Sequence, residues 1–215
     1  MGSTEIVDRV FVSQAFEYMS MGNLKAESRR LRPKSGALVF CREDPGIAKA
    51  TAVLFRRGLI NWAVLTGGVG KDSGTLTIPE AVHQRNLLVK AGVGKRFLYA
   101  EPTAHNGAEN SRFGIDAMRL KGLPCNNLLL VMHPHSARRA FAVHTRIARE
   151  EKGILYPNYI VVCMETILNV DDPNTCMELA RELLRVVDWP AKGWSDQQSN
   201  PPNELIAWAR SKVSS

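Results

Sequence analysis

Residues 61–101 read NWAVLTGGVGKDSGTLTIPEAVHQRNLLVKAGVGKRFLYAE and contain a complete strand–helix–strand pattern. Short apolar runs at 61–66 and 96–101 flank a longer amphipathic stretch at 77–92. Two parallel strands need a crossover connection between them, and a helix of this length is the usual one. The stretch therefore predicts a βαβ unit.

The same alternation continues along most of the chain. Repeated βαβ units give a parallel sheet covered on both faces, so we predict an α/β fold, a three-layer Rossmann-like sheet with helices on both sides. Right-handed crossovers then place the carboxyl ends of all strands at one edge, where ligands of such sheets bind. Strands are predicted at 37–40, 61–66, 96–101, 126–133 and 159–164, and helices at 45–58, 77–92, 106–122, 136–151 and 174–187.

Length and composition set the organisation of the chain. With 215 residues and 45% hydrophobic residues, the chain is long and apolar enough for one sizeable domain. We expect an N-terminal helix and basic linker at 1–35, the α/β domain at 36–190, and a Pro-rich tail with a short helix at 191–215. The first residues have no apolar core of a signal peptide, and no apolar run is of membrane-spanning length. The expected location is the cytoplasm.

The net charge of +7 suits an anionic partner, but the basic residues are scattered in pairs and short groups. No run of five or more occurs, and no nucleic-acid-binding motif is present. We therefore expect an anionic small-molecule ligand, with neither nucleic acid nor membrane as partner. The four cysteines are widely spaced without CxxC, which argues against a zinc ribbon or a redox motif.

The glycine-rich loop TGGVGKDSG at 66–74 follows a strand and precedes a helix. Such a loop can hold an anion with backbone amides and the helix dipole. It is neither a Walker A loop nor a GxGxxG that opens a helix directly. Gly67, Gly68 and Gly70 therefore either permit a long turn or form a ligand cradle.

Polar side chains at the same predicted edge have two interpretations. Thr77-Ile78-Pro79-Glu80 fits a capping box, and Asn106 with Glu109 fits a second helix start. Capping explains one carboxylate for each helix, but not why Glu101 should also end a strand at this edge. Catalytic or binding roles for these side chains stay open beside capping, as they do for Asn110.

The fourth strand ends in MHPHSARRA, which places His133 and His135 at the binding edge. They are candidates for metal binding, for proton transfer, or for plain loop positions. Metal sites usually need three protein ligands, and the third would have to come from one of the glutamates considered above. We expect no metal here. One of Arg138 and Arg139 should face the site, where a guanidinium suits a phosphate or carboxylate.

Taken in order, TGG after a strand, a helix opening with PEA, a strand ending in E, NGAEN and ARRA resemble the YdcF/SanA/ElyC family, most closely its YdcF branch. The similarity covers roughly residues 36–148. It implies a Rossmann-like fold and, for the YdcF branch, S-adenosylmethionine as a cofactor. It also implies site roles for seven residues: Gly67, Gly68, Glu80, Glu101, Glu109, Asn110 and Arg139. The chain departs from the SanA type where that type has a histidine three residues before the arginine, since Ser136 stands there.

Two functional hypotheses follow. In the first, the protein is an enzyme, a transferase or hydrolase, that acts on an anionic, nucleotide-like small molecule. The glycine loop and Arg139 would hold the anion, Asn106, Asn110 and His133 would contact the ligand, and one of the three glutamates would be the general base. In the second, the same site belongs to a non-catalytic, metabolite-binding regulatory module linked to maintenance of the cell envelope.

Overall fold

A computed structural model describes residues 3–21, 36–70, 75–155, 157–164, 166 and 168–214 of the protein. The basic linker at 22–35 and the second half of the glycine loop, 71–74, lie outside the described residues. Within the described ranges, no helix is both long enough and apolar enough to cross a lipid bilayer.

The strands form one sheet in the order β3-β2-β1-β4-β5, and every neighbouring pair is parallel. This confirms the predicted fold class. The strand order reverses between β1 and β4, because the chain builds outward from β1 in one direction and then returns to build in the other. The strands are β1 (Gly36–Phe40), β2 (Ala63–Thr66), β3 (Leu98–Glu101), β4 (Asn127–Met132) and β5 (Asn158–Cys163).

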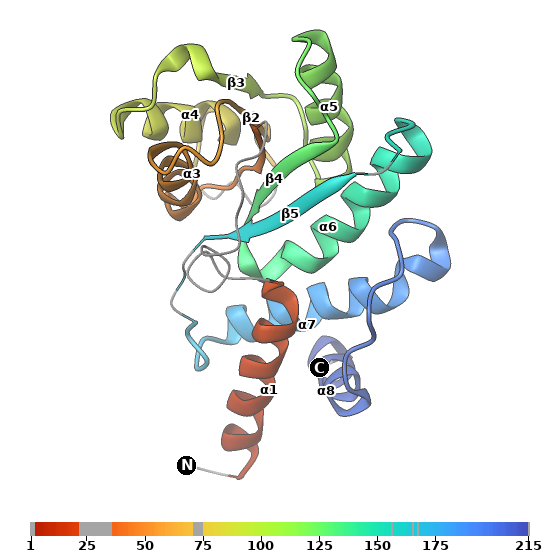
Figure 1. Cartoon of the computed structure of the whole chain (residues 1–215). Helices are drawn as coiled ribbons and strands as arrows, with labels where there is room; N and C mark the ends of the chain where they lie inside the picture. Colours follow the sequence, from red (N-terminus) through yellow and green to blue (C-terminus); the bar gives the residue numbers. More distant parts are fainter. Residues whose placement is uncertain are drawn as a thin grey trace.

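Two helices cover each face of the sheet (Figure 1). Alternate residues of β1 show why: Ala37 and Val39 belong to one buried cluster, and Leu38 and Phe40 belong to the other. Both faces of the strand are apolar, so both need a helical layer. The helices are α3 (Gly46–Arg56) and α4 (Glu80–Lys90) on one face, and α5 (Gly107–Leu120) and α6 (Ala137–Arg146) on the other.

The two ends of the chain lie together rather than as separate appendages. Helices α1 (Ser3–Ser20), α7 (Pro173–Asp188) and α8 (Asn203–Ser214) share a third buried cluster, below the sheet in the view of Figure 1. Its large members include Met19, Leu183 and Trp208. The Trp208 indole also donates to Asp8 at 3.1 Å, which ties α8 to α1. Helices α1 and α8, from the two expected terminal segments, therefore form one helical unit with α7.

Gly114 lets α5 approach the sheet closely. A Cβ at this position would lie 2.6 Å from Cδ1 of Leu38 and 2.9 Å from Cγ2 of Thr66. We expect Gly114→Val to lower the free energy of unfolding by about 1–3 kcal/mol, because core overpacking costs that much. Urea unfolding measures the loss. Leu120→Val, at an 84% exposed position of the same helix, is the control, and an equal loss in both variants would contradict the packing argument.

Candidate functional site

A pocket of about 890 Å³ lies at the carboxyl edge of the sheet. Phe40, Cys41 and Arg42 line it from the end of β1, and Met132 and His133 line it from the end of β4. These two strands are neighbours, and the loops that follow them diverge to opposite faces of the sheet. The pocket therefore occupies the topological switch point, which is where open α/β sheets bind ligands.

The glycine loop is built for close packing. Gly67 has φ +142°, and a Cβ there would lie 2.9 Å from Oε2 of Glu80. A Cβ on Gly68 would meet two backbone carbonyl oxygens, those of Pro102 at 2.9 Å and Ala104 at 3.0 Å. Side chains at these two positions would push the loop off its neighbours, so bare backbone is required.

The polar groups of that backbone are bonded within the protein. The Gly67 amide donates to the Glu101 carbonyl at 3.1 Å, and the Gly68 amide donates to the Ala104 carbonyl at 2.6 Å. Their own carbonyls accept from the first amides of α4, those of Glu80 and Ala81. Gly67 and Gly68 therefore position the loop rather than offer their N–H groups to an anion. Gly68 and Gly70 line the pocket, whereas Gly67 does not.

Of the three predicted glutamates, Glu80 lines the pocket, and its side chain is buried. The capping box expected from Thr77 is wrong, because α4 begins at Glu80 with Pro79 at the N-cap position. Pro79 is extended, with ψ 139°, so the helix cannot start earlier. The glycine-loop carbonyls satisfy the first amides instead, and this leaves the Glu80 side chain at the pocket wall.

Glu101 and Glu109 do not join Glu80 in the pocket lining. Glu101 is buried at the end of β3 and accepts from the Thr103 amide at 2.7 Å and its hydroxyl at 2.5 Å. Burial raises the pKa of the Cys41 thiol well above its usual range, and the nearby charges of Glu80 and Glu101 add to the rise. A thiol in these surroundings stays protonated and is not a nucleophile.

The start of α5 confirms the predicted cap. The Asn106 side chain accepts from the amides of Ala108 and Glu109, and Glu109 accepts from the Asn106 side chain at 2.7 Å and the His105 amide at 2.7 Å. One turn on, Asn110 lines the pocket. Its Oδ1 is buried without a hydrogen-bond partner among the described residues, so a ligand could supply the missing donor.

The two arginines of α6 have different tasks. Arg139 lines the pocket, pairs with the buried Glu182 of α7, and lies 5.5 Å from the ring centre of Trp189. Arg138 instead donates to the Tyr18 carbonyl at 2.6 Å and covers the Tyr18 ring at 4.2 Å. It therefore holds α1 against α6 rather than facing solvent.

Helix α7 forms a pocket wall that the sequence analysis missed. It contributes Glu178, Glu182 and Arg185, and Trp189 follows at its end. The signal was present, because these charged residues recur at spacings of four and three on one helix face. Their apolar neighbours Leu179, Leu183 and Val186 have the same spacing, and this pattern is that of any amphipathic helix, with or without a site on its polar face.

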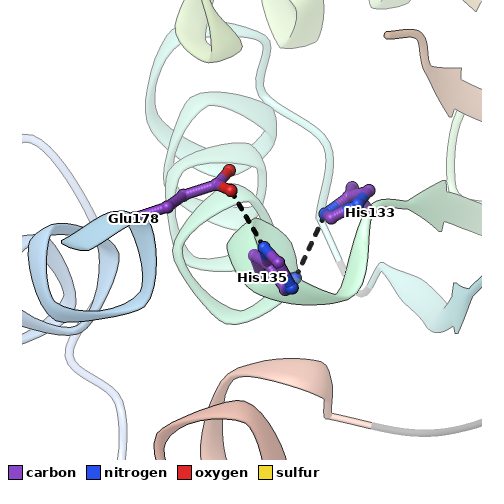
Figure 2. A group of neighbouring side chains, drawn as sticks. All are labelled: His133, His135 and Glu178. Carbon is purple, nitrogen blue, oxygen red and sulfur yellow. Dashed lines mark hydrogen bonds and ion pairs between the residues drawn. The ribbon is translucent and has the colours of Figure 1, made fainter. Parts of the chain in front are cut away.

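His133, His135 and Glu178 form a connected group beside the pocket (Figure 2). Nδ1 of His135 lies 2.9 Å from Glu178, and the Arg42 guanidinium donates to the same carboxylate at 2.9 Å. Burial lowers the pKa of His133 to about 3, with the charges of Arg42 and His135 adding to the shift. Burial alone would raise the pKa of Glu178, but the His135 hydrogen bond and Arg42 outweigh it and lower the pKa to about 2.

Comparison with known proteins places the chain beside a bacterial relative. The chain is 30% identical over 185 residues to Uncharacterized protein SCO4629 of Streptomyces coelicolor, and the match covers 82% of this chain and 80% of that protein. The chain belongs to the family of this Streptomyces protein. No model of a described protein family matches the chain. The relative's name states no activity, so the functional argument rests on the pocket.

Proposed function

We propose that the protein binds an anionic, nucleotide-like small molecule in the pocket between β1 and β4. The observation that carries the proposal is the position of Arg139, whose guanidinium reaches the pocket at the first turn of α5. Its Nη1 lies 2.9 Å from where a Cβ on Gly107 would be, so the guanidinium packs directly against the first residue of α5. A fixed guanidinium beside the N-terminus of a helix is a strong anion site.

A second helix start supports the same location. Helix α6 begins directly after the β4 loop, and Ser136, its N-cap residue, lines the pocket. The Ser136 side chain makes no capping hydrogen bond to a described residue. The first turns of α5 and α6 therefore both direct their positive dipole ends toward the space that Arg139 lines.

The balance of charges narrows the ligand class. Among the described lining residues, Arg42, Arg139 and Arg185 face Glu80, Glu178 and Glu182, so the formal charges cancel. Carboxylates accept hydrogen bonds from hydroxyl or amino groups, and arginines donate to anionic oxygens. A nucleoside compound that carries hydroxyl or amino groups as well as anionic oxygens fits this lining. S-adenosylmethionine, suggested by the resemblance to the YdcF branch, offers its carboxylate to the arginines and its ribose hydroxyls and amino groups to the glutamates, and it is the first ligand to test.

For an enzymatic role, Glu80 is the general base that we propose, because it is the one of the three predicted glutamates that reaches the pocket. Glu109 caps α5 and Glu101 bonds to Thr103, and neither residue lines the pocket. Glu80→Gln should therefore abolish turnover of a bound ligand while leaving its affinity within a few-fold. If no bound ligand is turned over by the wild type, the regulatory-module hypothesis holds instead.

The binding test is calorimetric titration with S-adenosylmethionine, ATP, a sugar nucleotide and inorganic phosphate. We expect saturable binding of a nucleoside compound, and Arg139→Gln should weaken it at least tenfold, because a charge-assisted hydrogen bond contributes about 1.5–3 kcal/mol. Arg146→Gln is the matched control, since Arg146 lies on the same helix and pairs with Glu150 instead. Equal affinities in the two variants, or no binding by the wild type, would refute the proposal.

A further inference from the structure

The loop after β4 and helix α7 bring two imidazoles and one carboxylate together. One potential ligand atom each from His133, His135 and Glu178 lies within 4.8 Å of the other two, and Figure 2 shows the three side chains converging. We propose that this cluster is a binding site for a divalent transition-metal ion, with Zn²⁺ as the best match. This inference is independent of the anionic ligand proposed above.

The three side chains are already held in place. His133 and His135 flank Pro134 in a single helical turn, and Nδ1 of His133 caps that turn by accepting from the His135 amide at 3.4 Å. The His135 ring is buried and packs edge-on against Phe16 of α1, with centroids 5.7 Å apart. Glu178 comes from α7, which the helical cluster with α1 and α8 anchors. Little ordering would therefore be needed when an ion binds.

The donor set selects the class of metal. Two imidazoles with one carboxylate is a set found in catalytic zinc sites, which hold the metal with three protein ligands and keep one position open. Imidazole donors favour zinc and its first-row neighbours over magnesium and calcium, which prefer oxygen ligands. Because His133 and Glu178 also line the pocket, the open position would face the proposed ligand.

The contact between His135 and Glu178 has to be rearranged when the ion enters, and the three donor atoms, which lie within 4.8 Å of one another, have to draw closer together. Nδ1 of His135 and Oε2 of Glu178 are 2.9 Å apart, a hydrogen-bond distance. Two ligands of a tetrahedral zinc ion with bonds of about 2.0–2.1 Å lie roughly 3.3 Å apart. The metal would thus replace this hydrogen bond after the His135 proton moves to Nε2. Arg42 would keep its bond to the other carboxylate oxygen and orient it, as outer partners of metal ligands do.

The test is titration of the metal-free, full-length protein with Co²⁺, followed by its visible absorption, and then displacement by Zn²⁺. We expect one equivalent to bind, with the intense bands of a four- or five-coordinate ion. Glu178→Gln should weaken binding by at least tenfold, and His135→Ala should abolish the bands. His83→Ala, which removes a histidine of α4 outside the cluster, should bind as the wild type does.

The outcomes separate clearly. Absence of saturable Co²⁺ binding, or binding that survives unchanged in both cluster variants, would overturn the proposal. Because His135 is buried, His135→Ala could fail to fold; the half-buried His133→Ala and the isosteric Glu178→Gln then provide the decision. Metal binding without any nucleoside binding would support this site and refute the proposed function. Nucleoside binding without any metal binding would support the proposed function and refute this site.

Discussion

Glu182→Ala is expected to lower the free energy of unfolding by about 3 kcal/mol. The Glu182 side chain is only 7% exposed and pairs with both Arg139 and Arg185. Its removal leaves Arg139, whose side chain is 14% exposed, without its carboxylate partner. Removing one partner of a buried ion pair costs about 3–5 kcal/mol. The lower end applies here because the pocket gives water access to the guanidinium.

Urea unfolding of the wild type, Glu182→Ala, Arg139→Ala and the double variant measures this loss and the coupling between the two groups. Because Arg139 and Glu182 compensate each other, the double variant should lose less than the sum of the single variants. Glu150→Ala is the control, since Glu150 also pairs with two arginines but at an exposed site, where an ion pair contributes about 0–1 kcal/mol. Additive losses would show that the pair does not act as a unit.

The ion pair between Arg139 and Glu182 also affects how tightly an anion can bind. An anion that enters beside Arg139 has to compete with Glu182 for the guanidinium, so binding in the wild type is weakened by this internal partner. In Glu182→Ala the anion would instead take the vacated place. Part of the lost stability should therefore return when S-adenosylmethionine or phosphate is added, if the ligand proposed above is of the right class.

The fold class could be predicted because its cause is local. Each strand is a short run of apolar residues, and each crossover helix has its own start and stop signals, so no long-range information was required. The packing of the terminal segments could not be predicted in this way. Helix α1 contacts α7 and α8 directly, and these partners stand at the other end of the sequence, so no local pattern indicates the contact.

The residues of the candidate site also fall into two groups, those that local sequence order predicts and those that depend on tertiary packing. Residues that follow strands, such as Glu80, Asn110, His133 and Arg139, were found because the sheet edge collects them. Glu101 and Glu109 were placed at the right edge, but local hydrogen bonds direct their carboxylates to Thr103 and to the cap of α5. Glu178 and Glu182 were missed because no rule of sequence order tells which face of a helix after the last strand will cover the site.

Acid is expected to destabilise the folded protein through one buried histidine, His144. His144 is fully buried on α6, both of its ring nitrogens lack a partner among the described residues, and its nearest rings are those of Phe40 and Tyr159. Burial lowers its pKa from 6.5 to about 3 in the folded protein. Below pH 6.5 the unfolded chain therefore binds a proton that the folded protein refuses, so stability falls as the pH falls from 6.5 toward 3.

At pH 5 this one group should cost about 2 kcal/mol relative to pH 7, because each pH unit between the two pKa values is worth about 1.4 kcal/mol. His144→Leu has nearly the same volume and cannot be protonated, so its stability should fall by about 2 kcal/mol less over this interval. It should also be no less stable than the wild type at pH 7, because two buried nitrogens without partners are removed. Urea unfolding of both proteins at pH 7, 6 and 5 measures the difference. Parallel curves would mean that His144 gains a hydrogen-bond partner or water in solution, since only then could the folded protein hold the charged ring without this cost.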